Sequence, residues 1–175
     1  MCQTNCRVPC KKINGSNKFL SSKFFCMEKK NKNGIMRRKI IFFILFLHNY
    51  IYIYSKGRFG KTIADRPCLI LESVGGKTGK LRKNVLVYLK EKDSICVVAS
   101  KGGSPKNPGW YHNLKNNPNA TIQIGRERFN ITSTEIFELE RIEWWKKMDY
   151  MNNGIYEQYQ SRTNRKIPIM LLKMT

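Results

Sequence analysis

The chain has 175 residues, and 33 lysines and arginines against 12 acidic residues give a formal net charge of +21 at neutral pH. This length favours one domain with an appendage, and a hydrophobic content of 41% excludes wholesale disorder. No repeat of about 20–50 residues is visible, which excludes a solenoid. A basic surface suits nucleic acid, anionic lipid or an anionic small molecule equally well, so charge alone does not identify the partner.

The first 35 residues are rich in lysine, asparagine and serine, and residues 1–39 carry 11 basic side chains and one acidic one. We predict a disordered basic leader over residues 1–35. Cys2, Cys6 and Cys10 in this leader lack further ligands at the spacing of a zinc site, so no metal site is expected. The proposed boundaries then place a helix and its connector at residues 36–66 and the folded domain at residues 67–175.

An apolar stretch begins after the basic triplet 37–39 and runs over residues 40–47, with tyrosines extending it to residue 54. His48 and Asn49 interrupt it before the roughly 20 apolar residues that a bilayer span requires. No small-residue cleavage site follows, as a signal peptide would need. We therefore predict a helix that packs on the domain or lies on a membrane surface, with a membrane anchor and a cleaved signal as alternatives. The protein is expected in the cytoplasm, with residues 37–54 contacting the inner face of the plasma membrane.

Six short apolar runs predict six strands: residues 68–71, 85–89, 95–99, 121–124, 128–131 and 167–172. The first three runs are continuous and β-branched, which is typical of strands covered on both faces. Hairpin-length connections join several of them, including Gly125-Arg126, and Pro168 belongs at the start of the last strand. The predicted class is α+β, built on an antiparallel, barrel-like sheet.

One longer helix is predicted from Glu138 to about Met151. Its apolar residues suggest two adjacent faces, one formed by Leu139, Ile142 and Trp145 and the other by Trp144, Met148 and Met151.

Two basic, glycine-rich turns follow predicted strands. The first contains Lys77, Thr78 and Gly79 with Arg82 behind it, and the second is Ser100-Lys101-Gly102-Gly103. Glycines allow successive backbone amides to point into one concavity, and the cations add full charge, so the pair is a candidate site for a phosphate or carboxylate. The first turn lacks the leading glycine of a nucleoside-triphosphate loop, and a plain basic hairpin is the alternative.

Aromatic residues lie beside the second turn and near the end of the predicted long helix. Trp110 and Tyr111 follow the second turn, and Tyr156 and Tyr159 come later in the chain. These side chains either pack in the core or line a pocket. No G-x-S-x-G elbow and no acid–base carboxylate pair is present, so an enzyme of this composition would depend on a bound cofactor for its reactivity.

Four motifs occur in a recognisable order: Gly76-Lys77-Thr78-Gly79-x-x-Arg82, then residues 97–103, residues 106–118, and the stretch from Tyr156 to Ile169. Together they resemble the deazaflavin-dependent nitroreductase family, split β-barrel oxidoreductases that use coenzyme F420. The resemblance covers roughly residues 40–175 and implies a split barrel of about six mostly antiparallel strands, with an N-terminal helix and a C-terminal helical segment.

The resemblance also implies roles for individual residues. The matched cofactor-binding positions are Lys77, Thr78, Gly79, Arg82, Ser100, Lys101, Gly102, Gly103, Trp110 and Tyr111. The matched catalytic positions are Ser100, Tyr156 and Tyr159, which would lie near the acceptor. The implied reaction passes hydride from reduced F420 to a quinone, a nitro compound or another conjugated, electron-poor acceptor. Relatives with an additional tyrosine near residues 151–154 differ from this chain there, which affects the acceptor pocket more than the cofactor site.

Two alternatives remain at this point. Related split barrels hold flavin mononucleotide (FMN) in the same cleft. A non-enzymatic protein that binds nucleic acid or anionic lipid through its basic surface is the other alternative, although no aromatic strand pattern for base stacking is present and no specific nucleic acid is expected. The oligomeric state is not determined by the sequence.

Overall fold

A computed structural model describes residue 40 and residues 43–175, so the predicted leader at residues 1–35 lies outside the described residues. Within the compact unit Leu45–Thr175, the elements in chain order are β1 (Thr62–Ile63), β2 (Arg66–Val74), β3 (Leu81–Glu91), β4 (Ser94–Val98), the short 3-10 helix η1 (Lys101–Gly103), α2 (Gly109–Asn116), β5 (Asn119–Ile124), β6 (Glu127–Glu135), α3 (Glu138–Met151), α4 (Ile155–Gln160) and β7 (Ile169–Met174). Residues 43–54 are also helical.

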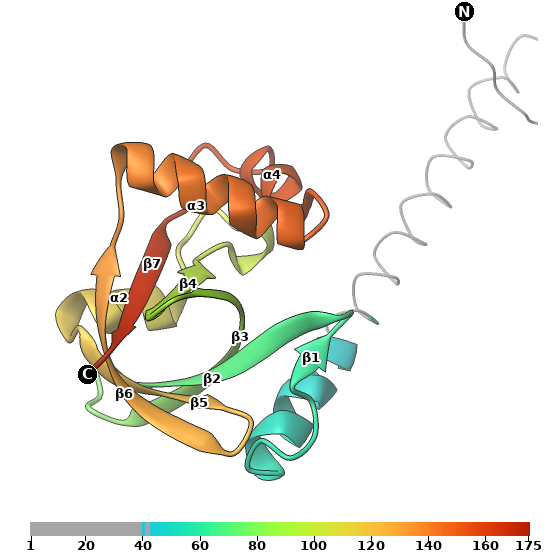
Figure 1. The fold of residues 1–175 in the computed structure, drawn as a ribbon, viewed down its shortest axis with the longest axis vertical. Helices are drawn as coiled ribbons and strands as arrows, with labels where there is room; N and C mark the ends of the chain where they lie inside the picture. Colours follow the sequence, from blue (N-terminus) through green and yellow to red (C-terminus); the bar gives the residue numbers. More distant parts are fainter. Residues whose placement is uncertain (1–39, 41–42) are drawn as a thin grey trace, which may run out of the picture. The chain divides into compact units, whose positions relative to one another are not determined.

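Six antiparallel strands close into a barrel in the order β2-β3-β4-β7-β6-β5, and a further pairing of β5 with β2 completes the ring. The short strand β1 adds to β2 outside this ring. The six predicted strands are the six barrel strands, so the predicted α+β barrel is confirmed, and α3 covers one side of the barrel in Figure 1. The turn at Gly125 is also as predicted, because its φ of +60° is a conformation that glycine adopts readily.

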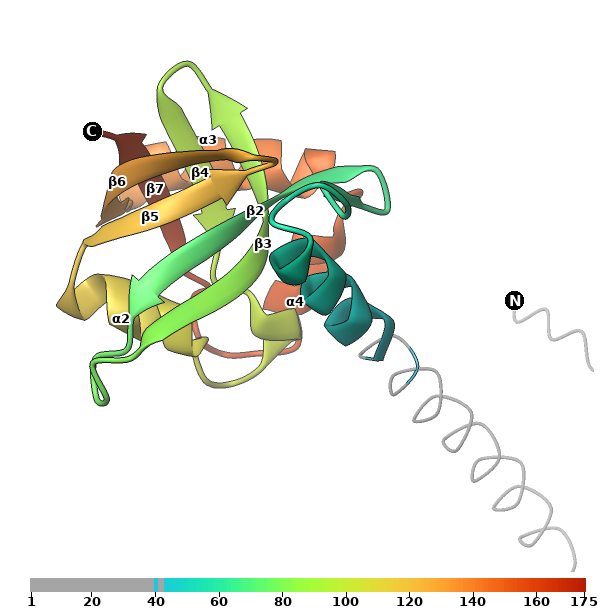
Figure 2. The same ribbon diagram turned by 90° about the horizontal axis from the view of Figure 1, so that it is seen from below.

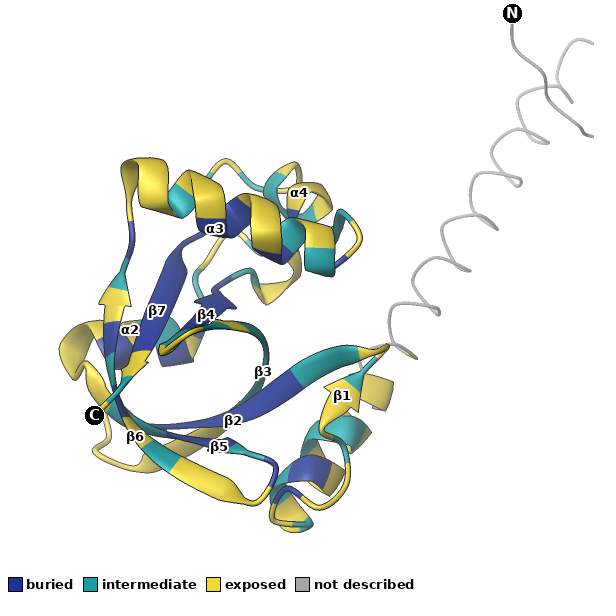
Figure 3. Cartoon of the chain, viewed as in Figure 1, coloured by how far each residue is buried: buried dark blue, intermediate teal, exposed yellow. Residues whose placement is uncertain are grey.

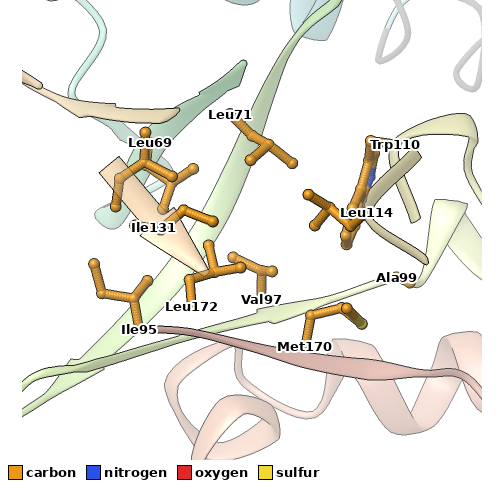
Figure 4. Packing of buried hydrophobic residues seen from close by; sticks show 11 residues of the cluster. Leu69, Leu71, Ile95, Val97, Ala99, Trp110, Leu114, Ile131, Met170 and Leu172 are labelled. Carbon is orange, nitrogen blue, oxygen red and sulfur yellow. The ribbon is translucent and has the colours of Figure 1, made fainter. Parts of the chain in front are cut away.

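The barrel interior is filled by the apolar runs that predict the strands. Leu69 and Leu71 from β2, Ile95 and Val97 from β4, and Leu172 from β7 are buried together (Figure 4). Strand β3 packs on both faces, because its alternate residues contact different clusters. Figure 3 shows the same strands as the buried centre of the unit, with exposed residues on the outer side of α3.

Helix α3 covers the second cluster of buried residues with Trp144, Trp145 and Met148. Its predicted bounds are confirmed, and of the two predicted apolar faces, the one formed by Leu139, Ile142 and Trp145 is buried only at Trp145. Leu139 is 76% exposed and Ile142 is 46% exposed. Leu139 lies nine residues before Met148, a rotation of about 180° on an α-helix, so it points away from the barrel.

The helical segment before β1 is attached to the barrel through Tyr52. This side chain is fully buried, and its hydroxyl donates to the Cys68 carbonyl at 2.9 Å and accepts from the Gly125 amide at 3.1 Å. Several of its neighbours remain exposed: Leu45, Phe46, Leu47, Tyr50, Ile51 and Tyr54. Among the described residues, none of the helices combines the length and apolarity needed to cross a bilayer.

Candidate functional site

The two basic turns lie at one pocket of about 900 Å³. Lys77, Thr78 and Arg82 reach it from the β2–β3 hairpin, Lys101 reaches it from η1, and Trp110 reaches it from α2. Figure 2 shows the hairpin turn beside α2. The complete lining is Gly75, Gly76, Lys77, Thr78, Arg82, Lys83, Asn84, Lys101, Pro108, Gly109, Trp110, His112, Asn113 and Asn116.

The pocket is strongly cationic. Four basic side chains line it and no aspartate or glutamate does. Lys83 forms an ion pair with the buried Glu72 at 2.9 Å, whereas Lys77, Arg82 and Lys101 have no ion-pair partner within the described part of the chain. Three lysine or arginine charges therefore remain available to an anionic ligand.

The β2–β3 turn is ordered by its own backbone and by α2. The Gly75 amide donates to the Lys80 carbonyl at 2.9 Å, and the Gly79 amide donates to the Gly75 carbonyl at 2.8 Å. Gly79 has a φ of +64°, which suits glycine. A Cβ at Gly76 would lie 2.4 Å from the side-chain Nδ2 of Asn116, so the turn lies directly against α2.

The N-terminus of α2 forms another part of the pocket wall, since Pro108, Gly109 and Trp110 line the cavity. No side chain caps this helix start. The partial positive charge of a helix N-terminus adds to the field of the lysines. Trp110 and Leu114 point from α2 towards the barrel strands in Figure 4, so Trp110 is both a core residue and part of the pocket wall.

The η1 turn has an unusual backbone. Lys101, Gly102 and Gly103 have φ values of +46°, +64° and +77°, three successive residues in a region that favours glycine. Lys101 lines the pocket, whereas its chain neighbours Ser100, Gly102 and Gly103 do not. Gly103 lies against α4, because a Cβ there would be 2.6 Å from the Tyr159 carbonyl oxygen.

The three tyrosines singled out from the sequence do not line this pocket. The Tyr111 hydroxyl donates to Glu135 Oε2 at 3.0 Å, and burial together with this carboxylate raises the pKa of Tyr111 to about 12. Tyr156 is buried against Trp145 in the second cluster, and burial raises the pKa of its phenol. Tyr159 is half-buried, and its ring packs edge-on to that of Tyr156 with centroids 6.3 Å apart.

The site therefore combines predicted and unpredicted residues. Lys77, Thr78, Arg82, Lys101 and Trp110 line the pocket, whereas Gly79, Ser100, Gly102, Gly103, Tyr111, Tyr156 and Tyr159 do not. Lys83, Asn84, His112, Asn113 and Asn116 line it without having been assigned a role from the sequence. The sequence does offer a signal for Asn113 and Asn116. They follow Trp110 at intervals of three residues, which on a helix places them on the same face as Trp110.

Residues 45–174 match the model of the F420H2-dependent quinone reductase family. The chain belongs to this family. The F420H2-dependent quinone reductase of Mycobacterium tuberculosis (strain ATCC 25618 / H37Rv) is 40% identical to it over 132 residues, which cover 74% of this chain and 89% of that protein. This match confirms the resemblance inferred from the four motifs.

Two solved structures have folds similar to that of this F420H2-dependent quinone reductase family member. An F420-H2 dependent reductase, FDR-A, has a TM-score of 0.57 and 36% identity, covering 64% of this chain and 98% of that one. A second structure, described as a domain-swapped dimer, has a TM-score of 0.58 and 34% identity, covering 74% of this chain and 97% of that one. The family member is an oxidoreductase with F420 as its cofactor, which decides against FMN and against a non-enzymatic basic binding protein.

Proposed function

We propose that this chain transfers hydride from reduced coenzyme F420 to a quinone, and that the pocket between the two basic turns holds the coenzyme. The observation that carries the proposal is the meeting of Lys77, Arg82 and Lys101 at one cavity with no acidic residue in its wall. A pocket of about 900 Å³ lies within the usual range for cofactor sites.

The residues of this pocket suit the coenzyme chemically. Coenzyme F420 carries a phosphodiester and an acidic oligoglutamate tail, which require cations and amide donors. Lys77, Arg82 and Lys101 supply the cations, and the start of α2 supplies a partial positive charge. Trp110 offers an apolar aromatic surface in the same wall, as a planar ring system requires.

Bound reduced F420 supplies the hydride. The protein then has to bind, orient and shield the reacting partners. We propose that Lys77, Arg82 and Lys101 bind the anionic part of the coenzyme while Trp110 fixes the orientation of its rings. The Ser100 hydroxyl, at the start of η1, would donate a hydrogen bond to the acceptor, and Tyr159, which lies against Gly103 at the end of η1, would lie near the acceptor too. Tyr156, buried beneath Tyr159, would hold that ring in place.

The test is fluorescence titration of the purified protein with F420, comparing wild type with Lys77→Ala and Lys101→Ala. Each substitution removes a charged contact worth about 1.5–3 kcal/mol, so Kd should rise at least tenfold. Lys147→Ala is the control, because this lysine pairs with Glu91 on the outer surface and does not line the pocket. Absence of wild-type binding at low salt would refute the proposal.

The acceptor is tested separately with reduced F420 and a series of soluble quinones and nitroimidazoles, following F420 oxidation. We expect quinone reduction to exceed nitroimidazole reduction, because this chain reads Met151-Asn152-Asn153-Gly154, without a tyrosine, in the stretch where the resemblance places an additional one. Faster nitroimidazole reduction would make a nitro compound the better description of the acceptor.

We propose further that the protein works in the cytoplasm and rests on the inner surface of the plasma membrane, where apolar quinones are found. Phe46, Tyr54 and Phe59 are 67%, 70% and 69% exposed, and Lys56 and Arg58 lie beside them. Apolar and aromatic side chains flanked by cations favour a lipid interface. Sedimentation with anionic vesicles should carry down wild type and much less of a Phe46→Ser/Tyr54→Ser/Phe59→Ser variant. Equal sedimentation of both would contradict the contact.

A further inference from the structure

Arg165 lies in the loop between α4 and β7, and its guanidinium group spans the base of the η1 turn. Nε donates to the Ser104 carbonyl at 2.8 Å. Nη2 donates to the carbonyls of Ala99 at 3.1 Å and Ser100 at 2.8 Å. These three carbonyls lie on both sides of Lys101–Gly103, so one side chain connects the start of the turn with its end.

The turn has a conformational cost that these bonds offset. A non-glycine residue with positive φ, as at Lys101, costs about 1–3 kcal/mol and persists only where the surroundings fix it. Within the turn, the Gly103 amide donates to Ser100 and the Ser104 amide donates to Lys101, at 3.0 and 3.2 Å. The Arg165 guanidinium adds three charge-assisted hydrogen bonds to these two weaker ones.

Arg165 is itself held in place by α4. Gln160 Nε2 donates to the carbonyls of Thr163 at 3.3 Å and Arg165 at 2.8 Å, and its Oε1 accepts from the Ile167 amide at 3.0 Å. The loop that carries Arg165 is therefore fixed at both ends, and the guanidinium has a stable base from which to reach the turn.

One nitrogen of the Arg165 guanidinium group is buried without a partner among the described residues, which indicates that this side chain does not serve stability alone. Nη1 is buried and has no hydrogen-bond partner in the described part of the chain. Burial lowers the pKa of this guanidinium. A buried N–H without a partner costs about 1–3 kcal/mol, a cost that proteins tolerate where geometry matters to a site.

We propose that Arg165 is a positioning residue for the coenzyme: it holds η1 in the conformation that directs Lys101 to the pocket shared with Lys77. The inference rests on the proposed function, since it assigns Arg165 an effect on F420 binding. Arg165 itself does not line the pocket, so it acts through Lys101.

The experiment measures the Kd for F420 and the Tm of wild type, Arg165→Lys and Arg165→Ala. Lysine keeps the charge but cannot reach carbonyls on both sides of the turn, so both variants should bind at least tenfold more weakly. Arg141→Ala is the matched control, because Arg141 is also half-buried and donates to the Ile167 carbonyl at 3.1 Å, in the same loop but away from η1. It should lower Tm while leaving Kd within twofold of wild type.

A double-mutant cycle separates positioning from general destabilisation. If Arg165 acts through Lys101, Arg165→Lys should weaken binding in wild type and have no further effect in Lys101→Ala. An equal loss in both backgrounds would overturn the inference, as would unchanged binding by Arg165→Lys. Wild type that does not bind F420 would instead refute the proposed function, so the two failures are distinguishable.

Addition of guanidinium chloride to Arg165→Ala provides a further readout. At constant ionic strength, millimolar guanidinium should recover part of the lost affinity, whereas sodium chloride should not. Equal recovery with sodium chloride would indicate a general salt effect and would contradict the assigned role of the guanidinium group.

Discussion

Asn113 on α2 accepts a hydrogen bond from the backbone amide of Gly76 in the β2–β3 turn, with the Oδ1 and N atoms 3.2 Å apart. Its Nδ2 donates to the Ser73 hydroxyl on β2, also at 3.2 Å. One amide side chain therefore connects two walls of the cationic pocket and keeps the turn that carries Lys77 against the helix that carries Trp110.

Replacement of this amide should weaken both coenzyme binding and the fold. We expect Asn113→Ala to raise the Kd for F420 by about three- to tenfold, and to lower the free energy of unfolding by about 1–3 kcal/mol, because two hydrogen bonds are lost. Asn117→Ala is the control, since Asn117 accepts from the Asn119 amide at the other end of α2. Equal effects of the two substitutions on Kd would contradict the assigned role of Asn113.

Trp110 should contribute both to stability and to binding, because it lies in the core and in the pocket wall. We expect Trp110→Ala to destabilise the protein by about 3–5 kcal/mol in denaturant unfolding. Leu114→Ala removes a side chain from the same cluster that does not line the pocket. It should cost about 2–5 kcal/mol without changing the Kd for F420, whereas Trp110→Phe should weaken binding while preserving the fold. Unchanged binding by Trp110→Phe would limit Trp110 to packing.

Glu72 should restrain the cationic field of the pocket. It is 4% exposed and pairs with Lys83 at 2.9 Å and Arg128 at 2.5 Å. We expect Glu72→Gln to lower stability by about 1–3 kcal/mol, because the buried carboxylate loses its charge and with it both ion pairs. The same substitution should tighten F420 binding about twofold at low salt, since it frees Lys83. The control Glu91→Gln breaks the exposed pair with Lys147 and should change neither quantity appreciably. Weaker binding by Glu72→Gln would contradict this electrostatic account.

The half-buried Tyr111 should make stability sensitive to alkaline pH. Burial and the Glu135 carboxylate raise its pKa from 10.0 to about 12. Its contribution is therefore fully present below about pH 10, and it is lost as pH rises from about 10 towards 12, because the unfolded chain releases the phenolic proton first. In denaturant unfolding across this pH range, the free energy of unfolding should fall less steeply for Tyr111→Phe than for wild type. Tyr150→Phe, at a tyrosine that is 87% exposed, should follow wild type. Identical slopes for Tyr111→Phe and wild type would contradict the assignment.

The barrel could be predicted because each strand is a short apolar run between clear turns. Cys68–Leu71 and Ile95–Ala99 read as buried strands from their residues alone, and both are buried. The basic turns could also be found, because Lys77 and Lys101 stand beside glycines after such strands. Their meeting at one pocket depends on the three-dimensional arrangement of hairpin, η1 and α2.

Other features required the structure because they depend on distant partners. The exposed position of Leu139 follows from which side of α3 meets the barrel, and an apolar residue can occupy either side. Similarly, the contact of Asn113 with the Gly76 amide joins positions 37 residues apart. The three hydrogen bonds of Arg165 reach a turn more than 60 residues earlier, so no local pattern indicates them.

The double pairing of β2 has a consequence for self-association. Each of the six barrel strands in the described chain has a neighbour along both edges, because β2 pairs with β3 and with β5. A second copy therefore has little free backbone edge onto which it can add a strand. Assembly of two copies would have to use side-chain surfaces, or exchange a strand that the barrel already contains.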